Sequence, residues 1–162
     1  RPGLIQLEIG VQSTNLDTIR EIHRTMKFEQ VAEVVRRINS YGNVHQHLDL
    51  IAGLPYENYE SFMRSFDDVY RMRPDQLQMG FLKVLKGSYM EEQVAAYDLK
   101  YRGIPPYEVL STKWLPYSDV IRLKGVEDIA ICTLTGADVV RHVIVQRIIK
   151  AYEIDEQKRM KR

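Results

Sequence analysis

Three stretches of the chain alternate between apolar and polar residues, at residues 4–12, 44–53 and 77–82. In the first stretch Leu7, Ile9 and Val11 fall on one face, whereas Glu8, Gly10 and Gln12 fall on the other. A period of two is typical of a β-strand whose two faces meet different surroundings. We therefore predict three strands, with starts near residues 5, 44 and 76.

Helical spacing separates these strands. Leu16, Ile19 and Ile22 follow the capping residues Thr14 and Asn15, and a second helix begins near Phe28 and stops before Gly42. A third helix is predicted between Asn58 and Pro74. Strands that alternate with helices predict a parallel sheet with the helices outside it. The expected fold class is α/β: a partial, TIM-like (β/α) barrel fragment with parallel strands, followed by C-terminal helices.

The segment Gly103–Pro106 reads as a linker. We predict that residues 1–102 form half of a barrel with three βα units, and that residues 103–162 form a helical C-terminal extension. A short helix is expected around residues 90–97, and longer ones at about 117–133 and 137–158. A strand at 139–145 is an alternative for part of the last helix, because that stretch is rich in Val and Ile.

Composition excludes several classes of protein. The 162 residues carry a net charge of +1 and 44% hydrophobic residues, and scattered tyrosines offer no stacking platform for nucleic acid. No apolar run approaches the ~18–20 residues that a membrane span needs. The single cysteine, Cys132, excludes an internal disulfide framework and favours a reducing, cytoplasmic location. The start without Met suggests a piece of a longer protein.

One face of each predicted strand is polar or carries glycine, in contrast to the branched apolar filling of an ordinary barrel. This face carries Glu8, Gly10 and Gln12, then His47, Asp49 and Gly53, then Gln78 and Gly80. Such an interior predicts a lumen that receives a ligand. His45 and His47 share a face as metal ligands would, but no third ligand has suitable spacing, so a structural role is favoured.

The motifs LEIGVQS (residues 7–13), IHR (22–24), LDLIAGLP (48–55) and PDQLQ (74–78) resemble the C-terminal half of the radical S-adenosylmethionine core. They are similar to those of oxygen-independent coproporphyrinogen oxidase and of Elp3/MiaB-like proteins. The runs QMGFLKVLKG (78–87) and YSDVIRLKG (117–125) resemble a subgroup that carries a cobalamin-binding domain. The resemblance covers roughly residues 4–128.

The resemblance implies a ligand site and its chemistry. Gln12 would bond the ribose hydroxyls of S-adenosylmethionine, Arg24 would pair with its carboxylate, and Asp49 would lie near the nucleoside. The turn of Gly53, Leu54 and Pro55 would shape the surroundings of the adenine. On the substrate side the candidates are Glu8, Gln78 and Lys83. The intact protein would cleave S-adenosylmethionine reductively to a 5′-deoxyadenosyl radical, at a [4Fe-4S] cluster and with cobalamin as a further expected cofactor.

Simpler roles compete with each of these. Gln12 could satisfy backbone groups at a strand end, Arg24 could neutralise a helix C-terminus, and Asp49 could be a partner of His47. The chain also departs from the family, because it has neither the CxxxCxxC cluster motif nor a Gly-Gly-Glu element. Both belong to the N-terminal half of the core, so the isolated chain is expected to be inactive.

Two other functions remain as alternatives. A non-catalytic α/β interaction or oligomerisation domain would keep the barrel pattern without the chemistry. A different barrel enzyme with a phosphate-bearing substrate is disfavoured, because no Gly-rich phosphate loop is present. Half a barrel leaves its first strand without a neighbour, which predicts a homodimer through the exposed edge. The substrate is expected to be a small molecule of unknown identity, with no nucleic acid or membrane as partner.

Overall fold

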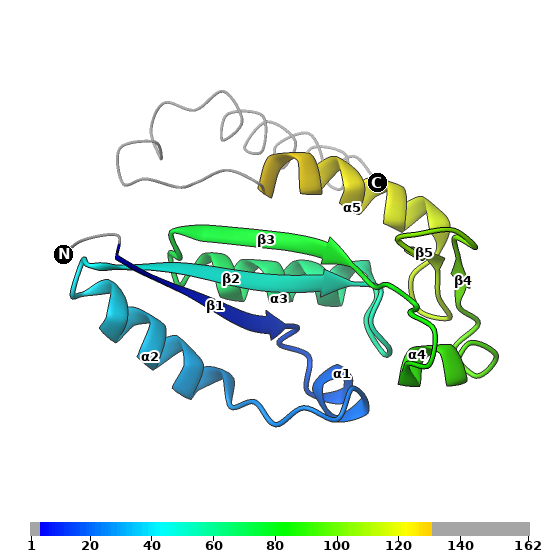
Figure 1. The fold of residues 1–162 in the computed structure, drawn as a ribbon, viewed down its shortest axis with the longest axis horizontal. Coiled ribbons are helices and arrows are strands. Elements are labelled where there is room, and N and C mark those ends of the chain that lie inside the picture. The colour runs from blue at the N-terminus through cyan, green and yellow to red at the C-terminus, as the bar shows by residue number, and fades with distance from the viewer. Residues whose placement is uncertain (1–3, 131–162) are drawn as a thin grey trace, which may run out of the picture.

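A computed structural model describes residues 4–130 of the chain. Its main sheet has three parallel strands, in the order β1 (Ile5–Gln12), β2 (Val44–Ala52) and β3 (Gln76–Phe81). The strands begin within a residue of the predicted starts. The α/β fold and the parallel pairing are thus confirmed, and Figure 1 shows the strands side by side and running in one direction.

Three helices connect the strands, namely α1 (Leu16–Glu21), α2 (Phe28–Asn39) and α3 (Tyr59–Tyr70). The predicted caps form. The Asn15 side chain accepts a hydrogen bond from the Asp17 amide at 3.0 Å, and the Asn58 side chain accepts one from the Ser61 amide at 2.9 Å. Each cap satisfies an amide that has no partner within its helix, which fixes where α1 and α3 begin.

The main core lies between one face of the sheet and the helices α2, α3 and α5 (Tyr117–Ala130). Its largest fully buried side chains include Phe62 of α3 and Leu123 of α5. From the strands come Val11, Leu48, Leu50, Ala52, Leu77, Met79 and Phe81. The alternation pattern assigns each of these residues to the apolar face of its own predicted strand, so the strand contribution to this core is as predicted.

A second, smaller sheet lies beyond the ends of the main strands. After the short helix α4 (Tyr89–Glu92), β4 (Lys100–Tyr101) pairs antiparallel with β5 (Val109–Ser111). The expectation of helices alone after residue 103 was therefore wrong for β5. A strand of three residues is too short to show a period, so the pattern carried no signal for it. The helix expected around residues 90–97 is also shorter than predicted.

The small sheet is joined to the main one by backbone hydrogen bonds. The Val109 amide donates to the Leu82 carbonyl at 2.8 Å, and the Val84 amide donates to the Tyr107 carbonyl at 2.9 Å. Strands on both sides of the boundary at residue 102 therefore pair with each other, and the division into 1–102 and 103–162 stays a prediction. The predicted elements at 137–158 and 139–145 lie outside the described residues.

Within residues 4–130, no helix covers the other face of the main sheet. Figure 1 shows α3 behind the strands and the face toward the viewer uncovered. On this inner face Glu8 and Gln78 are exposed, as expected for the open interior of a partial barrel. None of the helices between residues 4 and 130 has the length and apolarity to cross a lipid bilayer.

Candidate functional site

The inner face brings the predicted polar residues into neighbouring rows. In the parallel register Glu8 lies opposite His47, and Gly10 lies opposite Asp49. On the other side of β2, Asp49 lies opposite Gln78 and Ile51 opposite Gly80. Residues 8, 47, 49 and 78 therefore share one surface. They lie midway along the strands, and Gln12, which ends β1, lies at the carboxyl edge of the sheet, where ligands of open α/β sheets bind.

Gln12 ends β1 in an unusual conformation. The pairing with β2 shifts between Gly10 and Gln12, which marks a β-bulge, and Gln12 has a φ of 66°. A left-handed φ costs a non-glycine residue about 1–2 kcal/mol, so the surrounding structure must hold it. The side chain is half-buried and takes part in no hydrogen bond with the described residues. No hydrogen bond among the described residues therefore supports the simpler role of Gln12, in which its side chain satisfies backbone groups at a strand end.

Arg24 is placed by the turn that ends α1. The His23 amide donates to the Arg20 carbonyl at 3.0 Å, and the Arg24 amide donates to the Ile19 carbonyl at 3.0 Å. His23 has a φ of 56°. These two bonds around a left-handed residue form a Schellman motif, which reverses the chain direction at the helix end. The sequence Ile22-His23-Arg24 is thus a helix C-terminus that returns Arg24 toward the sheet.

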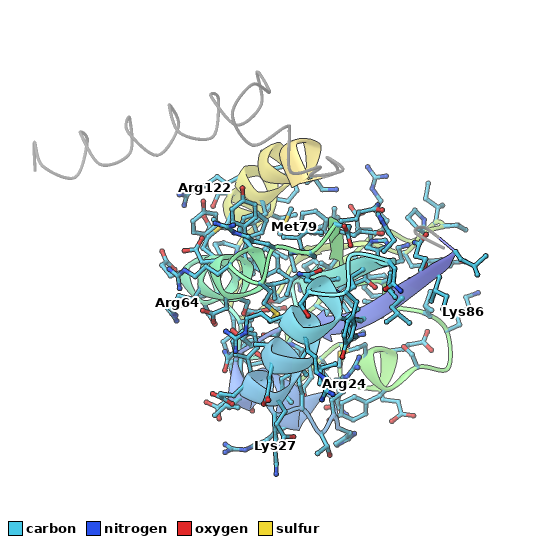
Figure 2. All side chains as sticks on the ribbon, turned by 90° about the vertical axis from the view of Figure 1, so that its left-hand side faces the viewer. Arg24, Lys27, Arg64, Met79, Lys86 and Arg122 are labelled. Carbon is cyan, nitrogen blue, oxygen red and sulfur yellow. The ribbon has the colours of Figure 1, made fainter. Side chains whose placement is uncertain are left out.

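The Arg24 guanidinium lies above Gly10. A Cβ atom on Gly10 would be 3.7 Å from Arg24 Nη1 and 3.6 Å from Gln12 Nε2. Both groups therefore lie beside Gly10 on the inner face of the sheet. Arg24 is exposed and forms no ion pair with any described residue. Figure 2 labels Arg24 near the short helix α4. An unpaired guanidinium beside an amide can accept a carboxylate and a hydroxyl group.

Asp49 is the acidic member of the group. Its Oδ1 lies 3.2 Å from His47 Nε2, and neither atom has an aligned hydrogen bond with the described residues. The His47 side chain is only 9% exposed, so the proximity gives geometric support to the alternative that Asp49 is the partner of His47. Burial raises the pKa of the Asp49 carboxyl, His47 partly offsets the shift, and Glu8 adds to it.

The turn Gly53-Leu54-Pro55 is packed rather than open. Leu54 is buried in a small cluster with Leu82 and Val109. The Thr18 hydroxyl donates to the Pro55 carbonyl at 2.8 Å, which ties the turn to α1. Gly53 has a φ of 88°, and a Cβ there would lie 2.8 Å from a Val109 methyl carbon. The turn thus joins β2, α1 and β5 directly beyond the site.

The substrate-side candidates separate in the structure. Glu8 and Gln78 belong to the inner face described above. Lys83 lies beyond the end of β3, where its backbone bridges to Glu108. Its side chain is exposed. The register therefore groups Glu8 and Gln78 with Asp49, and it does not group Lys83 with them.

A buried carboxyl group was missed by the sequence analysis. Glu57 is fully buried, and its Oε1 accepts hydrogen bonds from Ser13 Oγ at 2.6 Å and from Ser65 Oγ at 3.1 Å. Burial raises the pKa of Glu57 to about 7, while the two hydroxyl groups and Arg64 counteract the shift in part. Ser13 follows Gln12 directly, so this cluster fixes the loop that leaves β1. The only sequence signal for Glu57 was an acidic residue two positions after Pro55. Acidic residues are common in loops, so this signal did not indicate a buried carboxyl group.

The comparisons with known proteins give the family. A family model described as a protein of unknown function (DUF4080) matches residues 95–130. An oxygen-independent coproporphyrinogen III oxidase of Helicobacter pylori is 37% identical over 75 residues, which is 46% of this chain and 16% of the relative. A probable threonylcarbamoyladenosine tRNA methylthiotransferase of Pyrococcus abyssi is 32% identical over 74 residues, 45% of this chain and 17% of the relative.

Two further matches are broader. A PhoH-like protein of Synechocystis sp. is 35% identical over 109 residues, 65% of this chain and 31% of the relative. The structure of coproporphyrinogen III oxidase from Escherichia coli, a radical S-adenosylmethionine enzyme, superposes with a TM-score of 0.56 at 22% identity. This match covers 76% of the chain and 26% of the enzyme. The chain is similar to part of the radical S-adenosylmethionine core domain of such enzymes. It spans less than a third of the length of each of these relatives.

The residues present fit the two expected groups differently. The free guanidinium of Arg24, the amide of Gln12 and the carboxylate of Asp49 offer donors and acceptors that match a nucleoside with a carboxylate. The cluster does not fit this chain. It would need several thiolates, whereas the only cysteine is Cys132, and residues 4–130 contain no group of three or more potential metal ligands.

Proposed function

We propose that this chain is the S-adenosylmethionine-binding part of a radical enzyme. The observation that carries the proposal is that the Arg24 guanidinium and the Gln12 amide lie 3.7 and 3.6 Å from the Cβ position of Gly10. Both groups lie at the carboxyl edge of the sheet, and the chain keeps an unusual backbone at Gln12 and at His23 to present them. Backbone strain of this kind is commonly found at functional sites.

Each side chain has a distinct task in the proposed site. Arg24 pairs with the carboxylate of the ligand, because a guanidinium presents parallel N–H donors to two carboxylate oxygens. Gln12 bonds the ribose, since an amide can both donate to and accept from a diol. The Asp49 carboxylate accepts from a ribose hydroxyl, and His47, whose Nε2 lies 3.2 Å from Oδ1, keeps the carboxylate oriented. The closed turn at Gly53, Leu54 and Pro55 borders the adenine.

In an intact protein, a bound cluster and S-adenosylmethionine would supply the radical chemistry that abstracts hydrogen from the substrate. The chain provides no ligands for the cluster, so the isolated chain is proposed to bind without catalysis. The Helicobacter oxidase and the Pyrococcus methylthiotransferase are named for different substrates. The substrate of the protein that contains this chain is therefore left as a small molecule of unspecified identity. Cobalamin and a cytoplasmic location stay predictions from the sequence.

Calorimetric titration of the 162-residue chain with S-adenosylhomocysteine tests the proposal. Loss of a hydrogen bond to a charged group costs about 1.5–3 kcal/mol, so Arg24→Ala is expected to weaken binding roughly 10-fold to 100-fold. Gln12→Ala is expected to weaken it by a smaller factor. Arg20→Ala is the matched control, because Arg20 is an exposed arginine on α1 that pairs only with Asp17 among the described residues. Equal affinity in all variants, or no binding by the wild-type chain, would contradict the proposed site.

A second candidate function rests on the free edge of β1. Among the described strands β1 pairs only with β2, and Leu4 and Ile5 beside the open edge are 72% and 52% exposed. An apolar groove runs between this strand and α2, lined by Leu7, Ile9, Val31, Val34, Val35 and Ile38 with Glu8 and Gln30 at its rim. An open edge with apolar neighbours can pair with another copy of the chain. We therefore propose a homodimer through β1, as an oligomerisation function.

Light scattering after size-exclusion chromatography tests the dimer. The expected mass is twice the 19.0 kDa of the chain. Ile5→Lys should shift the population toward monomer, because a charged side chain at an open edge opposes strand pairing. Tyr41→Lys serves as the control, since Tyr41 is a 60% exposed residue that lies after α2. A wild-type chain that elutes as a 19.0 kDa monomer would refute the dimer.

A further inference from the structure

The end of α1 is held by a group of aromatic residues from the C-terminal part of the chain. Glu21 is the last residue of α1, and its Oε1 accepts hydrogen bonds from the hydroxyl groups of both Tyr89 and Tyr97. The bond from Tyr89 is 3.0 Å long, and the two hydroxyl oxygens are 3.3 Å apart. Tyr97 is 6% exposed, so this contact is shielded from water.

The same segment also contacts the turn after Glu21. The ring of His23 lies against the ring of Tyr89, with centroids 5.0 Å apart and planes tilted by 50°. Figure 1 shows α1 and α4 at the same end of the molecule. Residues 89–97 thus contact the Glu21 carboxylate on one side of the turn. On the other side they contact His23, whose backbone is in the left-handed conformation.

This support matters because the turn is weak by itself. Helix α1 has six residues, and isolated helices of that length are marginal in water. The turn also contains a non-glycine residue with a φ of 56°, which costs free energy that other contacts must offset. Without the two tyrosines, the Schellman motif that returns Arg24 over Gly10 would fray and Arg24 would sample other positions.

Burial and the acceptor Glu21 raise the pKa of the Tyr97 hydroxyl further above neutral pH, where a tyrosine is in any case a protonated donor. Arg24 itself has no ion pair with the described residues that could fix it from another side. The placement of its guanidinium therefore depends on the backbone turn, and the turn depends on Glu21 and His23.

We propose that Tyr97 and Tyr89 are positioning residues that hold Arg24 in place for the carboxylate of the ligand, through Glu21 and the turn at His23. The inference rests on the proposed function and extends it. It also gives a role to the first part of the segment 95–130, which matches the family model of unknown function and contains Tyr97. Tyr97 of that segment contacts the last residue of α1, three positions before Arg24.

Binding of two ligands distinguishes a positioning role of Tyr97 from a general role in stabilising the fold. S-adenosylhomocysteine carries the amino-acid carboxylate, whereas 5′-methylthioadenosine has the same nucleoside without it. Tyr97→Phe removes one hydroxyl and keeps the ring. It should weaken S-adenosylhomocysteine binding to the 162-residue chain roughly threefold to tenfold, as expected for one hydrogen bond. Binding of 5′-methylthioadenosine should not change, because that ligand does not reach Arg24.

A matched control variant and a double-mutant cycle of Tyr97 and Arg24 complete the experiment. Tyr101→Phe removes the hydroxyl of a half-buried tyrosine of β4 that has no hydrogen bond with the described residues, and it should alter neither affinity. In the Arg24→Ala background, Tyr97→Phe should cause no further loss, because residues that act through one another are not additive. If Tyr97→Phe fails to fold by circular dichroism, Tyr89→Phe carries the same test.

The experiment distinguishes a failure of the proposed function from a failure of the positioning role. If the wild-type chain binds neither ligand, the proposed function fails and this inference fails with it. If the wild-type chain binds both ligands and Arg24→Ala selectively weakens S-adenosylhomocysteine, the proposed function stands. In that case an unchanged affinity in Tyr97→Phe, equal weakening of both ligands, or a full additional loss in the Arg24→Ala background overturns the positioning role alone.

Discussion

Glu57→Gln should change how the stability of the chain depends on pH. Glu57 has no exposed surface, and its Oε2 has no hydrogen-bond partner among the described residues. Its Oε1 accepts from Ser13 and Ser65, at 2.6 and 3.1 Å. A glutamine has nearly the same shape and can accept the same two bonds, but it cannot ionise. The substitution therefore removes the charge and keeps most of the packing.

The magnitude follows from the raised pKa. Burial, only partly offset by Ser13, Ser65 and Arg64, raises the pKa of Glu57 from 4.5 to about 7 in the folded chain. The fold thus favours the neutral form. The contribution of this group to stability is fully present below about pH 4.5 and is lost as the pH rises to about 7. At about 1.4 kcal/mol per pKa unit, the loss is on the order of 3 kcal/mol.

Urea denaturation of the wild-type chain and of Glu57→Gln between about pH 4.5 and pH 7.5 measures this effect. Comparing the two proteins at each pH removes the contribution of other groups. The stability of the variant relative to the wild type should rise by about 3 kcal/mol across this interval. Glu29→Gln, at an exposed position in the first turn of α2, should give a difference that stays flat. A flat difference for Glu57→Gln as well would refute the reasoning.

Two other substitutions test local features. Gly53→Ala should destabilise the chain by roughly 1–3 kcal/mol, because φ is 88° there and a Cβ would lie 2.8 Å from Val109. Measured in a Val109→Ala background, the added cost should shrink to the backbone part alone, and an unchanged cost would rule out the clash. Asn58→Ala should cost about 1 kcal/mol in thermal or urea unfolding through loss of the bond to the Ser61 amide. Asn43→Ala, an exposed loop substitution, is its control, and equal effects would argue against the cap.

Local rules predicted most of the main sheet and its helices. The strands β1, β2 and β3, the caps Asn15 and Asn58, and the parallel order follow from side-chain alternation and from capping preferences, which depend on near neighbours along the chain. The strand pair β4–β5 was missed because its pairing depends on contacts with residues 82–84 rather than on its own pattern. The wrong expectation of helices alone after residue 103 has the same cause.

The candidate site divides in the same way. The motifs indicated Gln12, Arg24 and Asp49, but not how they meet, and the roles assigned to them remain proposals. Sequence patterns did not indicate Glu57 or Tyr97. Their importance comes from partners 44 and 76 residues away, and such partners leave no periodic signal.

The sequence by itself therefore determined the type and order of the main elements, because alternation and capping act within a few residues of the chain. The sequence also placed a glycine at position 10, which adds no side chain to the inner face of the sheet. Only the tertiary structure decided that the Arg24 guanidinium lies over Gly10 and that Glu21 is held by two tyrosines. Those arrangements depend on a strand bulge, a helix-end turn and the packing of distant segments, all of which are set by the fold as a whole.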